Sequence, residues 1–476
     1  MDSDAERAGQ SYRFGPLERR GLVAGWRGGQ IASVAGGLVL SVFGLRVLPT
    51  TIGLAVAIAV VAAAVGVATW PVGGRTFEEW VPDAVHYATT RRAGRQRGPR
   101  RVFDTLLLLE AALEVDARGG SVGVVYDRAA RTYTAVVTAS GHGFALLGRD
   151  DQASQVGSWA GVLSSLARQG GLVHRVQWVE RSLPDGGNEI RRHFGGRAVL
   201  EADTMASRSY AALLDGESLA AHRHEVLVAV TVHAGRASRA VRAAGGGDAG
   251  ACTVLLRELS TLRRRLGEAG IDVGPALAPR AVVGALRRGF DVDASVRTVD
   301  ASASVSSPWP MAIEPEWGRV RVDGTWHATY WVAEWPRTDV GPDFLGPLLL
   351  SSGVRRAVTL VMEPVSPLQA TRRAEQSRTA DIADAELRRR GGFLPTARRR
   401  REEEVLAHRE IELADGHAPY RFTGYVTVTS EEADTLDDAC TQVEQAAARS
   451  GLELRRCYGD QVRAFACTLP LGRGLA

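Results

Sequence analysis

The sequence predicts an α+β protein with a two-helix transmembrane hairpin near its amino-terminal end. A cytoplasmic body of antiparallel sheets with packed helices is expected to follow it. Three observations support this fold class. Residues 29–70 form an apolar stretch with almost no charge, arginines gather on both of its flanks, and from Val122 onward short β-type patterns alternate with helical patterns. With 476 residues, the chain is long enough for further domains beyond the hairpin.

The apolar stretch divides into two runs, Ile31–Leu48 and Ile52–Trp70, which are joined by Pro49-Thr50-Thr51. A helix of about 20 apolar residues crosses the core of a bilayer, and each run is close to that length. Because so short a turn reverses the chain, the segments before and after the hairpin must lie on the same side. A signal peptide is disfavoured because the apolar region is long and occurs twice. A buried hairpin of a soluble protein is disfavoured because neither run has a polar face.

The arginines indicate which side that is. They are numerous before and after the hairpin, whereas its turn offers only Arg46, which can snorkel to the interface. The positive-inside bias therefore predicts a multi-pass protein of the inner (plasma) membrane with both termini in the cytoplasm. The lipid bilayer is the first expected partner. The residues expected to anchor the hairpin at the membrane surface are Trp26, Arg27, Trp70, Arg75, Trp80, Arg91 and Arg92.

Composition divides the chain into consecutive segments. These are a basic lead-in at 1–28, the transmembrane hairpin at 29–70, a juxtamembrane amphipathic and basic segment at 71–101 with a bend at Pro82, a first cytoplasmic α+β domain at 102–300 and a second at 301–476. The second domain includes a charged helical arm at 367–412, in which runs of Arg and Glu meet at i,i+4 spacing.

The first domain begins with a β-hairpin, Ser121–Tyr126 and Thr132–Thr138, followed by a helix from Asp150 to about Gln169 and a strand at Leu172–Arg181. This ββαβ order resembles half of an α+β sandwich, and the pattern recurs loosely afterwards. Further helices are expected at Thr204–Leu213, Cys252–Gly267 and Pro279–Gly289, and further strands at Glu225–Val232 and Ala357–Val361.

The second domain contains an aromatic β region between Trp309 and Trp335 with a hairpin turn at Asp323-Gly324. Its last module is a ferredoxin-like βαββ unit. The expected elements are a strand at Phe422–Val428, a helix at Glu431–Ser450 capped by Ser430, and strands at Leu452–Cys457 and Val462–Cys467.

The chain contains no lysine, which excludes a Walker A loop, a Schiff-base lysine and the lysine of a protein kinase. The glycine-rich loop at Gly245–Gly250 lacks the residues that a phosphate loop requires. His222 and His224 alternate on a strand without a convincing third metal ligand. The four cysteines form neither a CxxC pair nor a zinc spacing. We therefore expect no enzyme, no cofactor, no metal and no catalytic residue.

Several motifs resemble parts of bacterial secretion machines. The start at Gly21-Leu22, Trp26–Gln30, the double apolar run and Gly74–Trp80 resemble PrgI-type inner-membrane subunits of type IV secretion and conjugation systems. The stretches Gly141–Phe144, Val361–Pro364 and Thr468–Gly472 resemble the non-catalytic amino-terminal domain of VirB/TraC-type conjugative ATPases. The overall plan resembles an actinobacterial integral membrane protein family that fuses these parts. EccE of type VII secretion, which also has a membrane hairpin and a cytoplasmic domain, is the rival resemblance.

The type IV resemblance implies a non-enzymatic inner-membrane scaffold that docks a separate motor ATPase and other membrane subunits; homo-oligomerisation is left open. One alternative is an EccE-like type VII component, and another is a membrane-tethered nucleotide- or nucleic-acid-binding protein, although nucleic acid is not the expected partner. A membrane-bound hydrolase has no motif in its favour. The expected partner surface, rich in residue types that dominate interfaces, consists of Trp326, Trp331, Arg388, Arg389, Arg390, Arg398, Arg399, Arg400 and Arg401.

Overall fold

The structure is a computed structural model. It describes residues 14, 28–47, 50–69, 77–92, 101–112, 120–141, 143–168, 170–184, 204–217, 222–291, 308–351, 353–366 and 419–474. The expected helical arm at 367–412 lies outside these residues, as does most of the basic lead-in.

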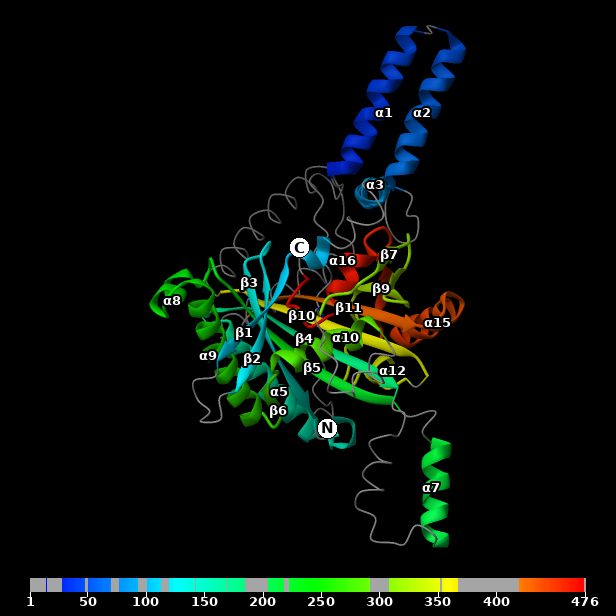
Figure 1. Ribbon diagram of the computed structural model, residues 1–476. Coiled ribbons are helices and arrows are strands. Elements are labelled where there is room, and N and C mark those ends of the chain that lie inside the picture. The colour runs from blue at the N-terminus through cyan, green and yellow to red at the C-terminus, as the bar shows by residue number, and fades with distance from the viewer. Residues whose placement is uncertain are drawn as a thin grey trace, which may run out of the picture.

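The apolar hairpin forms as predicted. Helix α1 spans Gly28–Val47 and α2 spans Thr51–Thr69, and the two project side by side from the body (Figure 1). Thr50 caps α2, because its side-chain oxygen accepts a hydrogen bond from Gly53 N at 3.2 Å. Helix α3 follows at Phe77–Arg92 near the base of the hairpin, and Pro82 lies inside it without ending it.

The body is built on one twelve-stranded sheet with antiparallel pairing throughout. Its amino-terminal half contains α4 Arg101–Asp104, β1 Leu106–Ala112, β2 Ser121–Asp127, β3 Thr132–Ser140, the 3₁₀ turn η1 Phe144–Leu146, α5 Arg149–Leu166, β4 Val173–Pro184, α7 Met205–Glu217, β5 His222–His233, α8 Ser238–Ala243, α9 Gly247–Glu268, β6 Asp272–Ala276 and α10 Pro279–Phe290. Its carboxy-terminal half contains β7 Ile313–Pro315, β8 Val320–Val322, β9 Thr325–Glu334, α12 Gly346–Leu349, β10 Arg355–Pro364, β11 Tyr420–Ser430, α15 Ala433–Arg449, β12 Glu453–Arg456 and α16 Gln461–Ala466.

The two halves repeat the same topology. The strand order is β1-β2-β3-β5-β4-β10-β11-β9-β8-β7, with β6 beside β3 and β12 beside β9. In each half a β-hairpin is followed by a helix, a strand at the centre of the sheet, a strand that inserts between that strand and the hairpin, a helix, a short strand and a last helix. An approximate twofold axis through the middle of the sheet therefore relates the two halves, where β4 and β10 pair.

The strand register supports this twofold relation. Trp178 faces Leu360 across the central pair, and the neighbouring positions pair symmetrically on either side of them. A second sign comes from a pair of threonines in each half. The side chains of Thr134 and Thr231 are 2.9 Å apart between β3 and β5, and those of Thr329 and Thr427 are 2.8 Å apart at the equivalent place between β9 and β11. The loose recurrence expected from the sequence lies within the amino-terminal half, at α7, β5, α9 and α10, whereas the structural repeat relates that half to the carboxy-terminal half.

Helices cover both faces of the sheet. On one face, Leu255 and Leu259 of α9 fill the core of the amino-terminal half, and Leu436 of α15 does so in the carboxy-terminal half. On the opposite face, Phe290 of α10 and Phe465 of α16 share one apolar cluster. Because successive side chains of a β-strand point to opposite faces, the buried valines of the strands pack against the helices on both faces of the sheet.

Residues 467–474, which we call the strap, cross that second face over the centre of the sheet. The buried side chain of Gln177 donates to the carbonyls of Cys467 and Leu469 at 2.8 Å each and accepts from Gly472 N at 2.7 Å. A Cβ on Gly472, whose φ is +66°, would lie 2.0 Å from Thr231 Oγ1. Only glycine therefore fits at this point of the strap.

Several expectations for local structure need correction. Residues 462–467 are not a strand, because Gln461, Ala464 and Phe465 are buried at helical spacing and form α16. Ser430 does not cap α15; its hydroxyl contacts Thr435 Oγ1 at 2.6 Å, and the helix begins after Glu432. The short strands β1 and β6 were not predicted, whereas β7, β8 and β9 lie in the expected aromatic β region. The expected domains at 102–300 and 301–476 share one sheet through β4 and β10.

Candidate membrane anchor and partner interface

The two hairpin helices expose large apolar side chains almost all the way round. Val39 is 70% exposed, Phe43 69% and Ile52 73%. Each helix has a 19-residue span that is long and apolar enough to cross a membrane, while few of its residues are buried in the protein. So continuous an apolar surface is suited to lipid rather than to water.

Polar side chains and a glycine hold the two helices together. Ser41 Oγ donates to Ala57 O at 3.1 Å, and Gln30 Nε2 donates to Ala68 O at 2.9 Å. A Cβ on Gly37 would lie 2.4 Å from Ala64 Cβ, so the small residue allows close contact. Close packing at small residues and hydrogen bonds between helices are the interactions that associate helices in lipid.

Helix α3 rests on the body through aromatic rings. Trp80 stacks on Trp317 with ring centroids 5.8 Å apart and contacts Tyr458 at 5.4 Å. Gly459 allows this approach, because a Cβ there would lie 2.9 Å from the Trp317 ring and 3.0 Å from Asp83 O. The base of the hairpin is therefore fixed to the carboxy-terminal half of the sheet.

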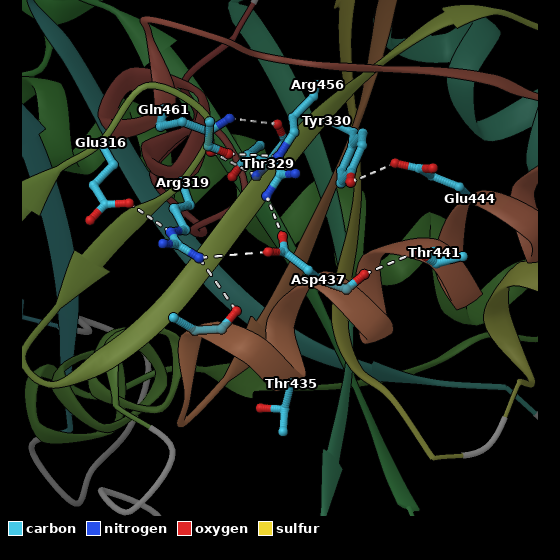
Figure 2. Close-up of polar contacts among 12 residues, drawn as sticks. Glu316, Arg319, Thr329, Tyr330, Thr435, Asp437, Thr441, Glu444, Arg456 and Gln461 are labelled. Atoms are coloured by element: carbon cyan, nitrogen blue, oxygen red, sulfur yellow. Dashed lines mark hydrogen bonds and ion pairs between the residues drawn. The ribbon is translucent and has the colours of Figure 1, made fainter.

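A polar network lies next to this aromatic contact and joins β9 to α15, β12 and α16 (Figure 2). Asp437 lies 3.7 Å from Arg319 Nη1 and 3.5 Å from Arg456 Nη2. Arg319 Nε also donates to Glu316 at 2.7 Å. Because Asp437 is 60% exposed, these ion pairs add little stability. They fix the positions of charges on the surface.

Beneath these charges the network is buried. Tyr330 donates to Glu444 Oε1 at 2.8 Å, and burial, followed by the Cys440 thiol, raises the pKa of its phenol. The phenol therefore stays protonated and remains a donor. Gln461 accepts from Thr329 N at 2.8 Å and donates to Thr329 O at 3.2 Å, which fastens α16 to the middle of β9.

The structure separates the two tryptophans of the expected partner surface. Trp326 and Trp331 lie five positions apart on β9 and therefore point to opposite faces. The guanidinium of Arg319 lies 4.8 Å and that of Arg321 5.7 Å from the centre of the Trp326 ring. Trp331 instead donates from its ring nitrogen to Thr423 Oγ1 at 3.0 Å. Arg319, Arg321 and Trp326 form one continuous cationic and aromatic surface, which we call the β8–β9 surface.

The other predicted site residues are placed as follows. Trp80 packs on protein, as described above. The backbones of Arg91 and Arg92 end α3, while their side chains lie outside the described part. The remaining predicted positions also lie outside the described residues; they are Trp26, Arg27, Trp70, Arg75, Arg388, Arg389, Arg390, Arg398, Arg399, Arg400 and Arg401.

Sequence analysis missed a contact made by Phe14, which precedes the hairpin. Its ring stacks on Trp335 with centroids 5.2 Å apart and also contacts Phe344 at 5.4 Å. These rings border an apolar cavity of about 280 Å³ that includes the axis residues Trp178 and Leu360. A lone phenylalanine in a polar segment carries no signal that could reveal such a contact.

The candidates for other chemistry do not assemble into a site. His224 Nδ1 lies 2.8 Å from Glu180 Oε1, and the described residues contain no group of three or more His, Cys, Asp or Glu that could hold a metal. Gly245, Gly246 and Gly247 all have positive φ and make the tight turn between α8 and α9. Burial raises the pKa of the Cys252 thiol to about 11, which makes it a poor nucleophile.

A comparison with protein families matches residues 220–332 to the family described as a putative type VII ESX secretion system translocon, EccE. The matched residues include β5, α9 and α10 of the amino-terminal half and the β8–β9 surface of the carboxy-terminal half. No curated protein matches the chain. The comparison supports the EccE resemblance and gives no support to the type IV resemblance.

Proposed function

We propose that this chain is a non-enzymatic membrane subunit of a type VII-like secretion apparatus, in which the hairpin anchors the sheet body beside the bilayer. The observation that carries the proposal is the match of residues 220–332 to the EccE family, in a chain that also has two apolar helices able to cross a membrane. The matched residues include Trp317, on which Trp80 of α3 stacks, and the β8–β9 surface, so part of the matched region lies beside the base of the hairpin.

The body and the segment before α1 share one side of the membrane in this proposal. Phe14 precedes α1, yet its ring packs on Trp335 of the body, which follows α2. A hairpin that crosses the bilayer twice satisfies this contact, whereas a single crossing would place the two rings on opposite sides. The arginine-rich flanks then favour the cytoplasmic side.

The β8–β9 surface is the proposed contact for a neighbouring subunit of the apparatus. Arg321 is 45% exposed and pairs with Glu314 at 3.7 Å, and Arg319 is 27% exposed. Arginine and tryptophan are enriched among residues that dominate interface energies. A motor ATPase is the partner class we propose, because a lysine-free chain lacks the phosphate-binding lysine that a motor of its own would need.

The test is affinity purification of the full-length chain in mild detergent from its native host, with mass spectrometry of what co-purifies. We expect other membrane subunits and an ATPase with the wild-type chain, and their loss with Arg321→Glu combined with Trp326→Ala. The control is Arg264→Glu, which changes an exposed arginine of α9 far along the sheet. Recovery of the chain alone, or ATP hydrolysis by the purified chain, would contradict the proposal.

A second experiment tests the membrane arrangement. Single cysteines placed before α1 and after the strap, in an otherwise cysteine-free chain, are treated with a membrane-impermeant thiol reagent in intact cells. Both positions should be protected until the cells are opened. Labelling of either position in intact cells would refute the cytoplasmic hairpin.

A further inference from the structure

The second face of the sheet has a small cavity lined by arginines from both halves of the molecule. Arg181 comes from β4, Arg288 from α10 and Arg355 from β10, and Thr429 and Leu469 complete the wall. The volume is about 40 Å³, which is room for about three water molecules or for one tetrahedral oxyanion. Arg181 lies at the bottom with 3% of its side chain exposed, whereas Arg288 and Arg355 are each 28% exposed. The cationic groups thus run from the mouth to the floor.

The floor of the cavity has an unused hydrogen-bond donor. Arg181 Nη1 donates to Ala285 O at 2.6 Å, but the buried Nη2 has no hydrogen-bond partner among the described residues. Burial lowers the pKa of Arg181 to about 10, so the group remains charged at neutral pH. Gly289 supplies the space, since a Cβ there would lie 3.2 Å from Nη2. A buried charged donor without an acceptor is costly unless something else occupies the site.

Nearby carboxylates only partly compensate these charges. Glu225 lies 3.7 Å from Arg181 and accepts from Arg288 at 2.5 Å, while Glu431 lies 3.4 Å from Arg355. The guanidinium groups of Arg181, Arg288 and Arg355 thus lie close to two carboxylates, those of Glu225 and Glu431. Arg356, which also borders it, is occupied by the carbonyls of Leu349, Ser351 and Val354.

We propose that this cavity binds a phosphate-class oxyanion, which accepts from Arg181 Nη2 and is held at the mouth by Arg288 and Arg355. Guanidinium groups pair well with tetrahedral oxyanions because their donors form a planar fork. Because the ligands come from β4, α10 and β10, the anion would connect the two halves of the sheet body across their axis. This site is independent of the proposed secretion role.

The experiment measures inorganic phosphate binding to the full-length chain in detergent, by isothermal titration and by the melting temperature. Potassium chloride at equal ionic strength is the reference. We expect phosphate to raise the melting temperature above the chloride value, and Arg288→Gln and Arg181→Met each to weaken phosphate binding by about tenfold or more. Arg264→Gln, a change at an exposed arginine of α9, should bind phosphate as the wild type does.

Arg181→Met removes a buried charged group and can therefore impair folding. The decisive comparison is Arg288→Gln, because Arg288 is partly exposed. Glu225→Gln adds a test in the opposite direction, since removing its negative charge should tighten phosphate binding. Titration with adenosine monophosphate then separates the sources. Binding of that ester identifies the phosphoryl end of a larger molecule, and binding of phosphate alone identifies the free ion. No phosphate effect beyond chloride, or an effect that Arg288→Gln retains, would overturn the proposal.

Discussion

The two halves of the sheet body share a topology but place their polar groups differently. Arg181 on β4 faces Glu225 on β5, and at the equivalent place Glu363 on β10 faces Arg421 on β11, so the charges are exchanged. A Thr–His pair is exchanged in the same way: Thr132 faces His233, while His327 faces Thr429.

The shared fold thus places polar cross-strand pairs at equivalent positions in the two halves. How deeply each pair is buried differs between the halves. In the charge pair of the amino-terminal half, the arginine, Arg181, is 3% exposed. In the equivalent pair of the other half, the arginine, Arg421, is 45% exposed. Conversely, His327 is fully buried and His233 is partly exposed. The buried members are Arg181 in the amino-terminal half and His327 in the carboxy-terminal half. We therefore expect equivalent substitutions in the two halves to change the free energy of unfolding by different amounts.

The largest asymmetry is expected at the strap. Gln177→Leu should lower the free energy of unfolding by about 4 kcal/mol, because three buried backbone groups of the strap lose a partner. The twofold-related change, Thr359→Val, should cost about 1 kcal/mol, since Thr359 makes one long contact of 3.5 Å to Thr468 O. Urea titration of the full-length chain in detergent, followed by tryptophan fluorescence, measures both. Equal losses would refute the asymmetry.

The exchanged charge pairs come next. Glu225→Gln should destabilise the chain by about 3 kcal/mol, because it leaves the buried Arg181 without a carboxylate. Glu363→Gln should cost about 1 kcal/mol, since its partners Arg236 and Arg421 are nearly half exposed and regain water, and the more buried Arg175, 3.9 Å away, keeps its hydrogen bond to Gly472 O. The same titration at neutral pH gives both values, and a larger loss for Glu363→Gln would contradict the interpretation.

The exchanged histidines predict a dependence on pH. Burial against Phe465 lowers the pKa of His327 to about 4, and the hydrogen bond to the Phe290 carbonyl only partly offsets this effect. Below the ordinary value of about 6.5 the unfolded chain takes up a proton that the folded chain does not, so stability falls as pH falls from 6.5 towards 4. The loss at pH 5 is about 2 kcal/mol.

The His327→Gln variant should show a correspondingly flatter pH profile of unfolding than the wild type. His233→Gln is the twofold-related control and should leave most of the slope in place, because that ring is partly exposed. Burial lowers the pKa of His174 to about 3, and this slope persists in both variants. An unchanged profile in His327→Gln would show that its proton uptake is not linked to unfolding.

The smallest effect tests what the halves share. Thr134→Val and Thr329→Val each remove the hydroxyl contact between paired threonines, and Thr134 also loses a longer contact of 3.3 Å to Leu471 O, so each should cost about 1 kcal/mol. Valine preserves the shape of the side chain, and the comparison therefore isolates the hydrogen bond. Losses that differ by more than about 1 kcal/mol would mean that the two threonine pairs are not equivalent.

Local patterns predicted most elements of this fold, and long-range contacts account for the misses. The apolar hairpin, the β2–β3 hairpin, α5, β5 and α15 follow from periodicity over neighbouring residues. Residues 462–467 were expected as a strand, and valine and phenylalanine do favour strands, but packing of Phe465 against Phe290 favours the helix α16 instead. The twofold repeat between the halves was not predicted, since the two halves have different residues at many equivalent positions, such as Gln177 and Thr359.

The candidate site shows the same limit. Trp326 and Arg321 lie close in sequence, and aromatic enrichment drew attention to that region. The contacts of Phe14 with Trp335 and of Trp80 with Trp317 join residues hundreds of positions apart, and no local pattern encodes them. The cavity of Arg181, Arg288 and Arg355 likewise arises only when three distant elements meet.

The strap has a consequence for how the protein is made. Residues 467–474 are translated after all the described strands of the sheet, yet Gln177, in the first half of the chain, depends on them for its hydrogen bonds. The hairpin at 28–69 emerges long before. The described strands therefore precede the segment that covers one face of their sheet, and that face can close only once residues 467–474 have been made.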